Sequence, residues 1–487
     1  MMNTIMNGKE SAVKTQEYKL LKCPTGIKGF DEISFGGLPR NRPTLVVGTI
    51  GSGKTFFSME FLLNGVIRYN ETGVFMTFEE KTEELITNVS SLKYNLPQLI
   101  NDKKIHLEHL LINQNEVHEA GKYNIDGLFV RLDLAIKKTK AKRIVLDSMD
   151  TLFLNLDKKM LTAEFHRLFT WLKDRNVSAI ITAELGDTFL TRLGLEENIA
   201  DCVIELTNRV INQISTRRIR IIKYRGSNHA NNEYPFIIDA NGMNVFPIVL
   251  RLFDQKILSK RIFSGIKKLD EMLDNKGFFV GSSILISGTA GTGKTSIVSS
   301  FAKSACNENS KCLFCLFEEA PNQLIRNMLS IGISLDEFVK DGLIEFYYAR
   351  PSLQDLELHF MEIKEIIEKT KPMVILLDPV TNLMTEGPNS DVRSMLTRFV
   401  DFLKMKNITV MFTAAITLGS ISQNPSDEGI SSMVDTWIML DDLVFDKKRT
   451  RTISVMKSRG MIHSKDVREF IISTNGIEIA KLDANKK

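Results

Sequence analysis

Cysteine and tryptophan are scarce in this chain, and long apolar runs are missing. Five cysteines among 487 residues are too few for the disulfide framework of a small secreted protein. No uninterrupted apolar stretch is long enough to cross a bilayer, and the polar start MMNTIMNGKES lacks the apolar core of a signal peptide. These absences predict a cytoplasmic protein without a membrane segment.

A strong excess of charge is also missing. The 63 basic and 59 acidic residues leave a net charge of +4, which gives no reason to expect nucleic acid or an anionic membrane as a partner. The length predicts at least two domains.

Cys312 and Cys315 form a CxxC in KCLFCLFEE. This run is typical of a strand, where residues three apart point to opposite faces, so we expect two buried thiols rather than a metal or redox site.

The sequence contains an internal repeat. TGIKGFDEISFGGLPRNRPTLVVGTIGSGKT at 25–55 matches SGIKKLDEMLDNKGFFVGSSILISGTAGTGKT at 264–295, and FEE, an apolar strand ending in Asp, and KxRGxxH follow in the same order in both halves. Short apolar strands alternate with helical patterns, which predicts an α/β fold with a mainly parallel sheet in each half. We expect a flexible start at 1–14, domains at 15–248 and 261–480 joined by a linker at 249–260, and a short end at 481–487.

Each half carries a phosphate-binding loop. GTIGSGKT and GTAGTGKT fit GxxxxGK[ST] between an apolar strand and a helical run, so backbone N–H groups can surround phosphate oxygens. The lysines would reach the outer phosphates, and the final threonines would offer a hydroxyl to Mg²⁺. The predicted ATP-binding residues are Gly48, Thr49, Gly51, Ser52, Gly53, Lys54, Thr55, Gly288, Thr289, Gly291, Thr292, Gly293, Lys294 and Thr295.

Acidic residues follow two strands of each half. Asp147 and Asp378 each end an apolar strand, the position of a second aspartate that holds Mg²⁺. A pair of glutamates closes another strand, where it can hold a water or hydroxyl for in-line attack. The candidate catalytic residues are Glu79, Glu80, Glu318 and Glu319.

The doubled loop, the doubled FEE, the KxRGxxH elements and the serines of GISSMVDTW resemble the KaiC family of circadian-clock ATPases and autokinases, within the RecA-like superfamily. The resemblance covers nearly the whole chain. It implies two tandem RecA-like domains stacked as a double-ring homohexamer, with ATPase activity in the first domain and autokinase and autophosphatase activity in the second. It implies that six residues reach the nucleotide of a neighbouring subunit: Lys223, Arg225, His229, Lys457, Arg459 and His463.

The resemblance also gives the serine pair a role. Ser431 and Ser432 would be the phosphorylation sites, and an offset of 234 residues places them opposite Glu197 and Asn198. Phosphoserine adds about −1.5 to −2 charge at neutral pH. We therefore expect Glu197 to hold permanently an acidic state that Ser431 gains only on modification.

A second difference separates the halves. Glu184 in TAE matches Ala415 in TAA, so the second half lacks a carboxylate that could control an attacking water. The difference in residue number between matching positions of the two halves increases by three between 416 and 431. This change predicts a three-residue insertion in the loop that carries the serines.

Several features depart from the best-known clock members. They carry Ser-Thr at the paired site, and they continue beyond the point where this chain ends, through a tail that the activator KaiA captures; KaiA-type activation is therefore not expected. A second-half arginine that approaches phosphate in clock members has no match near Thr385. A KaiB-like protein remains an expected partner of the first ring. Residues 113–126 have the composition of a loop, which permits them to take part in that contact.

Two other interpretations remain open. A DNA-dependent RecA-like ATPase would need a basic channel with stacking residues, and with tryptophan only at Trp171 and Trp437 the sequence shows no obvious one. In a nucleotide-dependent scaffold without kinase activity, the serines would be ordinary turn residues. DNA-stimulated ATPase activity would favour the first alternative, and unchanged function after Ser→Ala substitution the second.

Overall fold

The computed structural model describes residues 20–90, 94–110, 125–153, 158–186, 190–191, 199–211, 214–247, 259–350, 356–385, 389–416, 432–445 and 448–482. The chain divides into two compact units: Met1–Arg209 with Arg217–Val249, and Val210–Thr216 with Leu250–Lys487. The finer domain boundaries expected from the sequence remain predictions.

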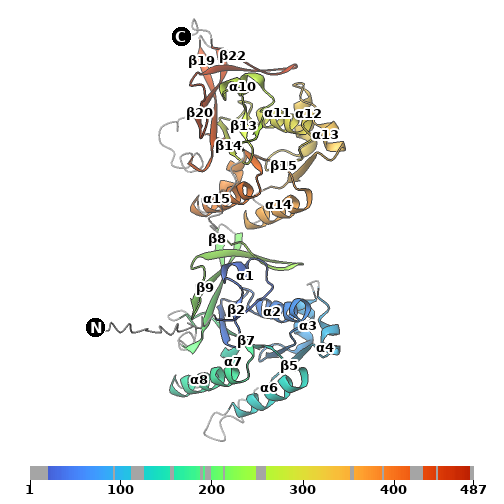
Figure 1. Cartoon of the computed structure of the whole chain (residues 1–487), viewed down its shortest axis with the longest axis vertical. Coiled ribbons are helices and arrows are strands. Elements are labelled where there is room, and N and C mark those ends of the chain that lie inside the picture. Colours follow the sequence, from blue (N-terminus) through green and yellow to red (C-terminus); the bar gives the residue numbers. More distant parts are fainter. Residues whose placement is uncertain are drawn as a thin grey trace, which may run out of the picture. The chain divides into compact units, whose positions relative to one another are not determined.

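The first unit is built on a nine-stranded sheet (Figure 1). Its strands are β3 (Pro43–Gly48), β4 (Gly73–Thr77), β5 (Ile105–His109), β6 (Arg143–Asp147), β7 (Ser178–Glu184), β8 (Cys202–Ile211), β9 (Ile214–Tyr224), β10 (Glu233–Asp239) and β11 (Gly242–Val245). They lie in the order β5-β4-β6-β7-β3-β8-β9-β10-β11. The pairs from β5 to β8 are parallel, whereas β9–β10 and β10–β11 are antiparallel.

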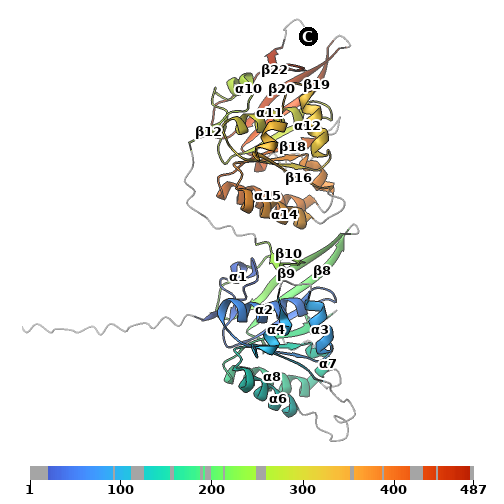
Figure 2. The same cartoon turned by 90° about the vertical axis from the view of Figure 1, so that its right-hand side faces the viewer.

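Helices cover both faces of this sheet (Figure 2). They are α1 (Phe30–Ile33), α2 (Lys54–Tyr69), α3 (Thr82–Val89), α4 (Leu96–Asn101), α6 (Asp126–Thr139), α7 (Met149–Phe153) and α8 (Lys158–Asp174), with a small ladder of β1 (Lys22–Cys23) and β2 (Leu38–Pro39). Successive strand residues face opposite sides. Val46 accordingly joins the core under α2, while Leu45 and Val47 join the core under α6 and α8. Both faces are buried, which explains the apolar strands.

The second unit repeats this arrangement. Its large sheet contains β14 (Ser283–Gly288), β15 (Cys312–Leu316), β16 (Ile344–Tyr348), β17 (Val374–Asp378), β18 (Thr409–Ala415), β19 (Thr436–Phe445), β20 (Lys448–Ser458), β21 (Arg468–Ser473) and β22 (Gly476–Lys481). The order β16-β15-β17-β18-β14-β19-β20-β21-β22 matches the first unit strand for strand. The predicted pair of α/β domains with mainly parallel sheets is confirmed.

The remaining elements of the second unit correspond to those of the first. They are β12 (Arg261–Ile262), β13 (Phe278–Phe279), α10 (Lys267–Met272), α11 (Lys294–Asn307), α12 (Pro321–Leu329), α13 (Asp336–Lys340), α14 (Leu356–Thr370), the 3₁₀ helix η2 (Val380–Thr385) and α15 (Asn389–Met405). Cys312 lies in the core under α11, and Cys315 in the core under α14 and α15. The predicted opposite orientation of these two thiols is therefore confirmed.

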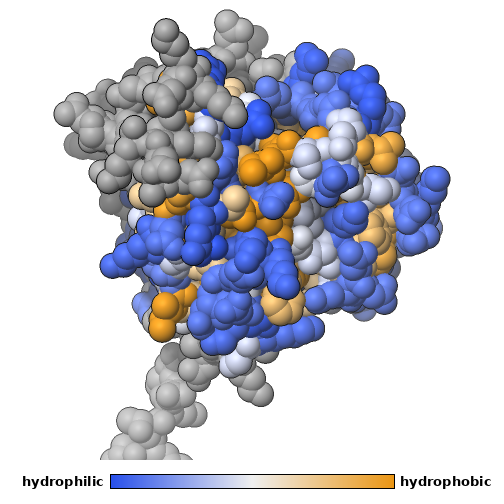
Figure 3. All heavy atoms as spheres, turned by 90° about the horizontal axis from the view of Figure 1, so that it is seen from above, coloured by the Kyte–Doolittle hydropathy of each residue, from blue (hydrophilic) through white to orange (hydrophobic). Residues whose placement is uncertain are grey.

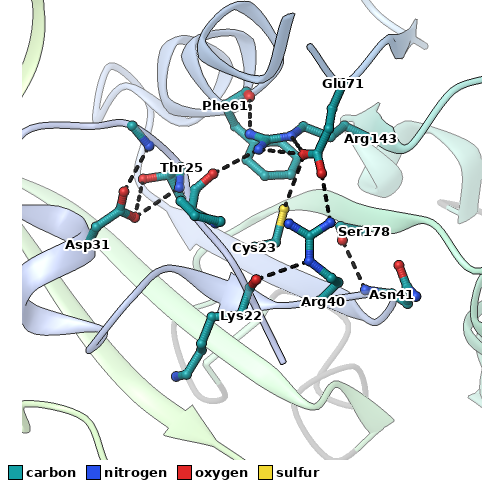
Figure 4. Close-up of polar contacts among 12 residues, drawn as sticks. Lys22, Cys23, Thr25, Asp31, Arg40, Asn41, Phe61, Glu71, Arg143 and Ser178 are labelled. Carbon is teal, nitrogen blue, oxygen red and sulfur yellow. Dashed lines mark hydrogen bonds and ion pairs between the residues drawn. The ribbon is translucent and has the colours of Figure 1, made fainter. Parts of the chain in front are cut away.

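A buried ionic network ties α2 to the sheet in the first unit (Figure 4). The Arg143 side chain is fully buried and donates to Glu71 Oε2 at 2.7 Å, to Phe61 O at 2.8 Å and to Pro24 O at 2.9 Å. Arg40 donates to the other oxygen of Glu71 at 2.7 Å. The network holds the start of β6 against α2, at the end of the sheet opposite the P-loop.

None of the helices among the described residues combines the length and the apolar character needed to cross a bilayer. The face seen in Figure 3 is mainly hydrophilic around a central apolar area.

Candidate nucleotide sites

The first P-loop connects the carboxyl end of β3 to the start of α2. Gly51 and Gly53 have φ values of +73° and +95°, which only glycine adopts readily. A Cβ on Gly53 would also lie 2.7 Å from Ile238 Cδ1. The Lys54 ammonium donates to Gly48 O at 2.9 Å and to Thr49 O at 3.2 Å. The loop is therefore wound around its own lysine, with backbone N–H groups at the helix start available for an anion.

The second P-loop has the same geometry between β14 and α11. Gly291 and Gly293 have φ values of +81° and +100°, and a Cβ on Gly293 would lie 2.6 Å from Ile472 Cδ1. Lys294 donates to Gly288 O at 2.8 Å and to Thr289 O at 2.7 Å. Ser52 and Thr292, at matching positions, are both buried. Both loops therefore have the shape that phosphate binding requires.

A buried aspartate lies beside each P-loop. Asp147 ends β6 and accepts a hydrogen bond from Thr182; Asp378 ends β17 and accepts one from Thr413. Burial raises the pKa of both carboxyls. Hydrogen bonds from Thr55 and Thr295 oppose that rise, so each P-loop threonine lies next to its aspartate.

These residues fit a magnesium ion. Threonine and aspartate oxygens are the hard donors that Mg²⁺ prefers, and a buried carboxylate needs a compensating positive charge. Across the described ranges no group of three His, Cys, Asp or Glu side chains could hold a metal by itself. An ion here would therefore take further ligands from phosphate oxygens and water.

The glutamate pairs follow β4 and β15 in the same way. Glu79 and Glu318 are exposed, and their negative charge contributes to the raised pKa of Asp147 and Asp378. They therefore lie close to the proposed metal ligands. The second glutamate of each pair is half-buried and is held by an asparagine eight residues later: Glu80 accepts from Asn88 at 3.3 Å, and Glu319 accepts from Asn327.

The first glutamate differs between the units. Thr151 on α7 donates from Oγ1 to Glu79 Oε1 at 2.6 Å. Its counterpart after β17 is Asn382, which donates from Nδ2 to Phe317 O at 3.4 Å. The Glu79 carboxylate is therefore oriented by a threonine that the second unit lacks. Sequence reasoning missed Thr151, although the repeat alignment contained the difference.

A cavity of about 390 Å³ opens beside the first P-loop. Arg217 of β9 lines it and donates from Nε to Gly51 O at 3.3 Å. Sequence reasoning missed this arginine, because β9 reaches the loop only through the fold. The lining consists of Gly51, Ser52, Gly53, Lys54, Thr55, Phe56, Glu80, Leu85, Asn88, Val89, Arg217 and Ile238. Apolar and polar side chains are mixed, as expected of a nucleotide pocket.

The candidate cations of the first unit lie at the other end of the sheet. Lys223 is near the end of β9, and Arg225 N donates to Asp201 O at 2.8 Å, just before β8 begins. Cys202 pairs with Thr44, and Leu206 pairs with Gly48. This span is roughly 13 Å along the strand. Lys223 and Arg225 therefore lie away from the P-loop of their own unit, and His229 stacks on Tyr224 beside them.

The second unit places its cations in the same way. Arg459 N donates to Asp435 O at 2.8 Å, Lys457 Nζ donates to Val434 O at 2.9 Å, and His463 is half-buried shortly beyond. Asp435 is held in turn by Lys404 at 2.8 Å, as Asp201 is held by Lys173 at 2.7 Å in the first unit. A lysine–aspartate pair therefore supports the basic segment of each unit.

Only part of the predicted serine region lies within the described residues. Ser432 is exposed, and its carbonyl oxygen accepts a hydrogen bond from Arg459 Nη2 at 3.0 Å. Ser431, Glu197, Asn198 and the insertion expected in 416–431 lie outside the described residues, except for Ile416. Of the loop expected to bind a partner, only Ile125 and Asp126 are described.

The glutamate-to-alanine difference lies next to the P-loops. Glu184 pairs with Gly48 at the end of β7, and Ala415 pairs with Gly288 at the end of β18. Glu184 is half-buried, and its N–H donates to Asp150 Oδ2 at 2.6 Å. The offset inferred from the sequence is correct at this position.

Comparisons with known proteins agree with this geometry. The profile of the family described as "ATPase: KaiC" matches residues 23–249 and 262–484. The chain is 43% identical over 468 residues to the circadian clock protein KaiC2 of Synechocystis sp., covering 96% of this chain and 82% of that protein. It is 37% identical to the circadian clock oscillator protein KaiC of Parathermosynechococcus lividus, covering 94% and 85%. It is 35% identical to KaiC of Synechococcus elongatus, covering 96% and 90%.

Proposed function

The chain belongs to the KaiC family of ATPases, and we propose that it is an ATP-hydrolysing homohexamer that phosphorylates and dephosphorylates its own serines. In this proposal the first unit hydrolyses ATP, and the second transfers phosphate to Ser431 or Ser432. Mg²⁺ accompanies ATP at both sites. The assembly acts in the cytoplasm as a timing or signalling switch.

The contact between Arg459 and Ser432 carries the kinase proposal. Arg459 binds the Ser432 carbonyl, and Lys457 binds the Val434 carbonyl two residues on. The serine and both cations therefore lie together at the end of the second unit's sheet that is away from its own P-loop. If the cations reach the phosphates of a neighbouring copy, the serine reaches the same place.

The residues at the second P-loop can then perform the transfer. Glu318 accepts the proton of the serine hydroxyl, the serine oxygen attacks the γ-phosphorus of ATP, and the bond to the bridging oxygen of ADP breaks. Lys294 and the cations of the neighbouring copy stabilise the charge on the transferred phosphoryl group. Asp378 and Thr295 would hold Mg²⁺, which supplies further charge neutralisation when bound.

Phosphopeptide mass spectrometry tests the kinase. The purified chain is incubated with Mg-ATP beside Glu318→Gln and the matched control Glu79→Gln. We expect phosphate on Ser431 or Ser432 in the wild type and in Glu79→Gln, and at least about a hundredfold less in Glu318→Gln. ATP hydrolysis without serine phosphate would contradict the kinase and favour a scaffold or a simple ATPase.

Subunit mixing tests the shared sites of the first ring. Lys54→Ala removes the cation of the P-loop, and Arg225→Ala removes the cation offered to a neighbour. Each variant alone should lose first-unit ATP hydrolysis, but in mixed hexamers an Arg225 from one subunit can complete the intact P-loop of the next. Partial recovery of hydrolysis on mixing is expected. No recovery in hexamers shown to be mixed would contradict the shared site.

A KaiB-like protein is the proposed partner of the first unit, through residues 113–126. The support is membership of the family and the loop composition of that segment. Co-elution with a purified KaiB protein, beside a variant in which 113–124 are replaced by a short glycine–serine linker, tests it. Equal binding by both forms would place the contact elsewhere.

A further inference from the structure

Two cysteines of the second unit lie side by side in a place that the nucleotide chemistry does not use. Cys306 is in the last turn of α11, and Cys312 is the first residue of β15. Their sulfur atoms are 3.7 Å apart, and both side chains are at least 97% buried. The residues between them form an exposed turn, so the pair lies just beneath the surface.

The surroundings of the pair hold it in place. Cys312 Sγ lies 3.8 Å from Ala302 O and 3.7 Å from Ser310 O, and Cys306 Sγ lies 3.9 Å from Leu343 O. A disulfide needs a sulfur–sulfur distance of about 2.05 Å, so the two atoms have to approach by roughly 1.7 Å. Side-chain rotations of the two cysteines have to supply this approach, and how far the backbone must follow is measured by the stability test below.

The pair is specific to the second unit and to one face of its strand. The repeat places Val66 and Gly73 of the first unit at the positions of Cys306 and Cys312. Cys315 lies on the same strand but faces the opposite core. Cys23 and Cys202, the remaining cysteines, belong to the first unit.

We propose that Cys306 and Cys312 form a thiol–disulfide site that links α11 to β15 under oxidising conditions. Helix α11 begins at Lys294 of the P-loop, and strand β15 leads to Glu318. The proposal is independent of the kinase, because it concerns the end of α11 away from the nucleotide.

The oxidant belongs to the class of small disulfides, such as oxidised glutathione. Local opening of the exposed turn between the two cysteines admits the small disulfide. The Cys306 thiolate then attacks one sulfur of the small disulfide and releases its other half as a thiolate. The Cys312 thiolate then attacks the Cys306 sulfur and expels the second half. Two protein thiols lose two electrons and two protons, and the small disulfide gains them. The interaction with the neighbouring Cys312 thiol lowers the pKa of Cys306, which supports Cys306 as the first nucleophile.

Peptide mapping tests the site on the full chain. Trypsin cuts after Lys303, Lys311 and Arg326, so it separates SACNENSK from CLFCLFEEAPNQLIR unless a disulfide joins them. After oxidised glutathione and alkylation of free thiols, we expect the joined peptides, with loss of two hydrogen atoms, in the wild type. Cys315→Ser should keep the link, and Cys306→Ser and Cys312→Ser should each abolish it. Persistent mixed disulfides, or free thiols in the folded chain, would overturn the proposal.

A stability measurement shows whether the disulfide is compatible with the native fold of the second unit or distorts it. In a Trp171→Phe background, fluorescence of Trp437 reports unfolding of the second unit. A disulfide compatible with the native geometry should raise the urea midpoint relative to the reduced chain, and Cys306→Ser should remove that difference. A lower midpoint on oxidation would show that the bond distorts the unit and would overturn the proposal.

Discussion

Arg143 and Val374 occupy the same place in the two units, as the first residues of β6 and β17. Arg143 pairs with Gly73 of β4, and Val374 pairs with Cys312 of β15. In the first unit a buried guanidinium fills this end of the sheet, bound to Glu71 and to backbone carbonyls. In the second unit aliphatic side chains and two thiols fill it.

The other end of each sheet is nearly unchanged between the units. Both P-loops wind around a lysine, and both aspartates accept a threonine hydroxyl. The backbone of a phosphate-binding loop tolerates little variation in its geometry. A core position, by contrast, needs only a side chain that fills the space and has partners for any buried charge or polar group. The two units can therefore differ in how the far ends of their sheets are held while sharing one nucleotide geometry.

The largest expected effect comes from breaking the network of the first unit. Arg143→Ala leaves Glu71 without its buried partner and opens a cavity, so the free energy of unfolding of the first unit should fall by about 3–5 kcal/mol. Urea unfolding followed by Trp171 fluorescence, in a Trp437→Phe background, measures it. Arg143→Ala with Glu71→Ala should lose less than the sum of the single variants. A loss below about 1 kcal/mol in Arg143→Ala would show that the network adds little.

Acid should weaken the same network by a smaller amount. Burial alone would raise the pKa of Glu71, but hydrogen bonds from Arg40 and Arg143 outweigh burial and lower it from its ordinary value of 4.5. The charged form therefore stabilises the fold above about pH 4.5, and this stabilisation is lost as the pH falls through the lowered pKa. Urea unfolding at a series of pH values should show a steeper loss below pH 4.5 in the wild type than in Glu71→Gln. Parallel curves would exclude Glu71 as the source.

The sequence predicted the nucleotide end of each unit better than the far end. GxxxxGK[ST] and an aspartate after an apolar strand are local patterns with one common geometry, so the fold, the P-loops and the places of Asp147 and Asp378 could be inferred. The shared LITN and LIRN segments also contained Asn88 and Asn327, which hold the second glutamates.

The missed residues depend on contacts between distant elements. Arg217 reaches Gly51 only because β9 lies beside β8, which in turn pairs with β3. The CxxC spacing drew attention to Cys312 and Cys315, while the thiol next to Cys312 comes from α11. Periodicity along one strand could predict that two cysteines face opposite sides of the sheet. It could not identify the helix residue that packs against one of them.

Thr151 offers a more selective test of the difference between the sites. Thr151→Val removes the hydroxyl that orients Glu79, so kcat of first-unit ATP hydrolysis should fall about tenfold, or roughly 1.4 kcal/mol. KM should change little, because Thr151 contacts the glutamate and not the P-loop. Steady-state kinetics in a Glu318→Gln background measures it, and Thr151→Ser should restore most of the rate. An unchanged kcat in Thr151→Val would contradict a positioning role.

The smallest expected effect concerns Glu184 and Ala415, which end equivalent strands beside the P-loops. A carboxylate there can help to hold an attacking water, while Glu79 remains in place. Glu184→Ala should therefore lower first-unit hydrolysis only about threefold. Ala415→Glu should shift the second unit from phosphorylating serine toward hydrolysing ATP, because water gains a second acceptor near the γ-phosphate. In a Glu79→Gln background, the ratio of released phosphate to phosphoserine measures this shift. An unchanged ratio in Ala415→Glu would mean that the acceptor is chosen by the position of the serine rather than by the carboxylates around the water.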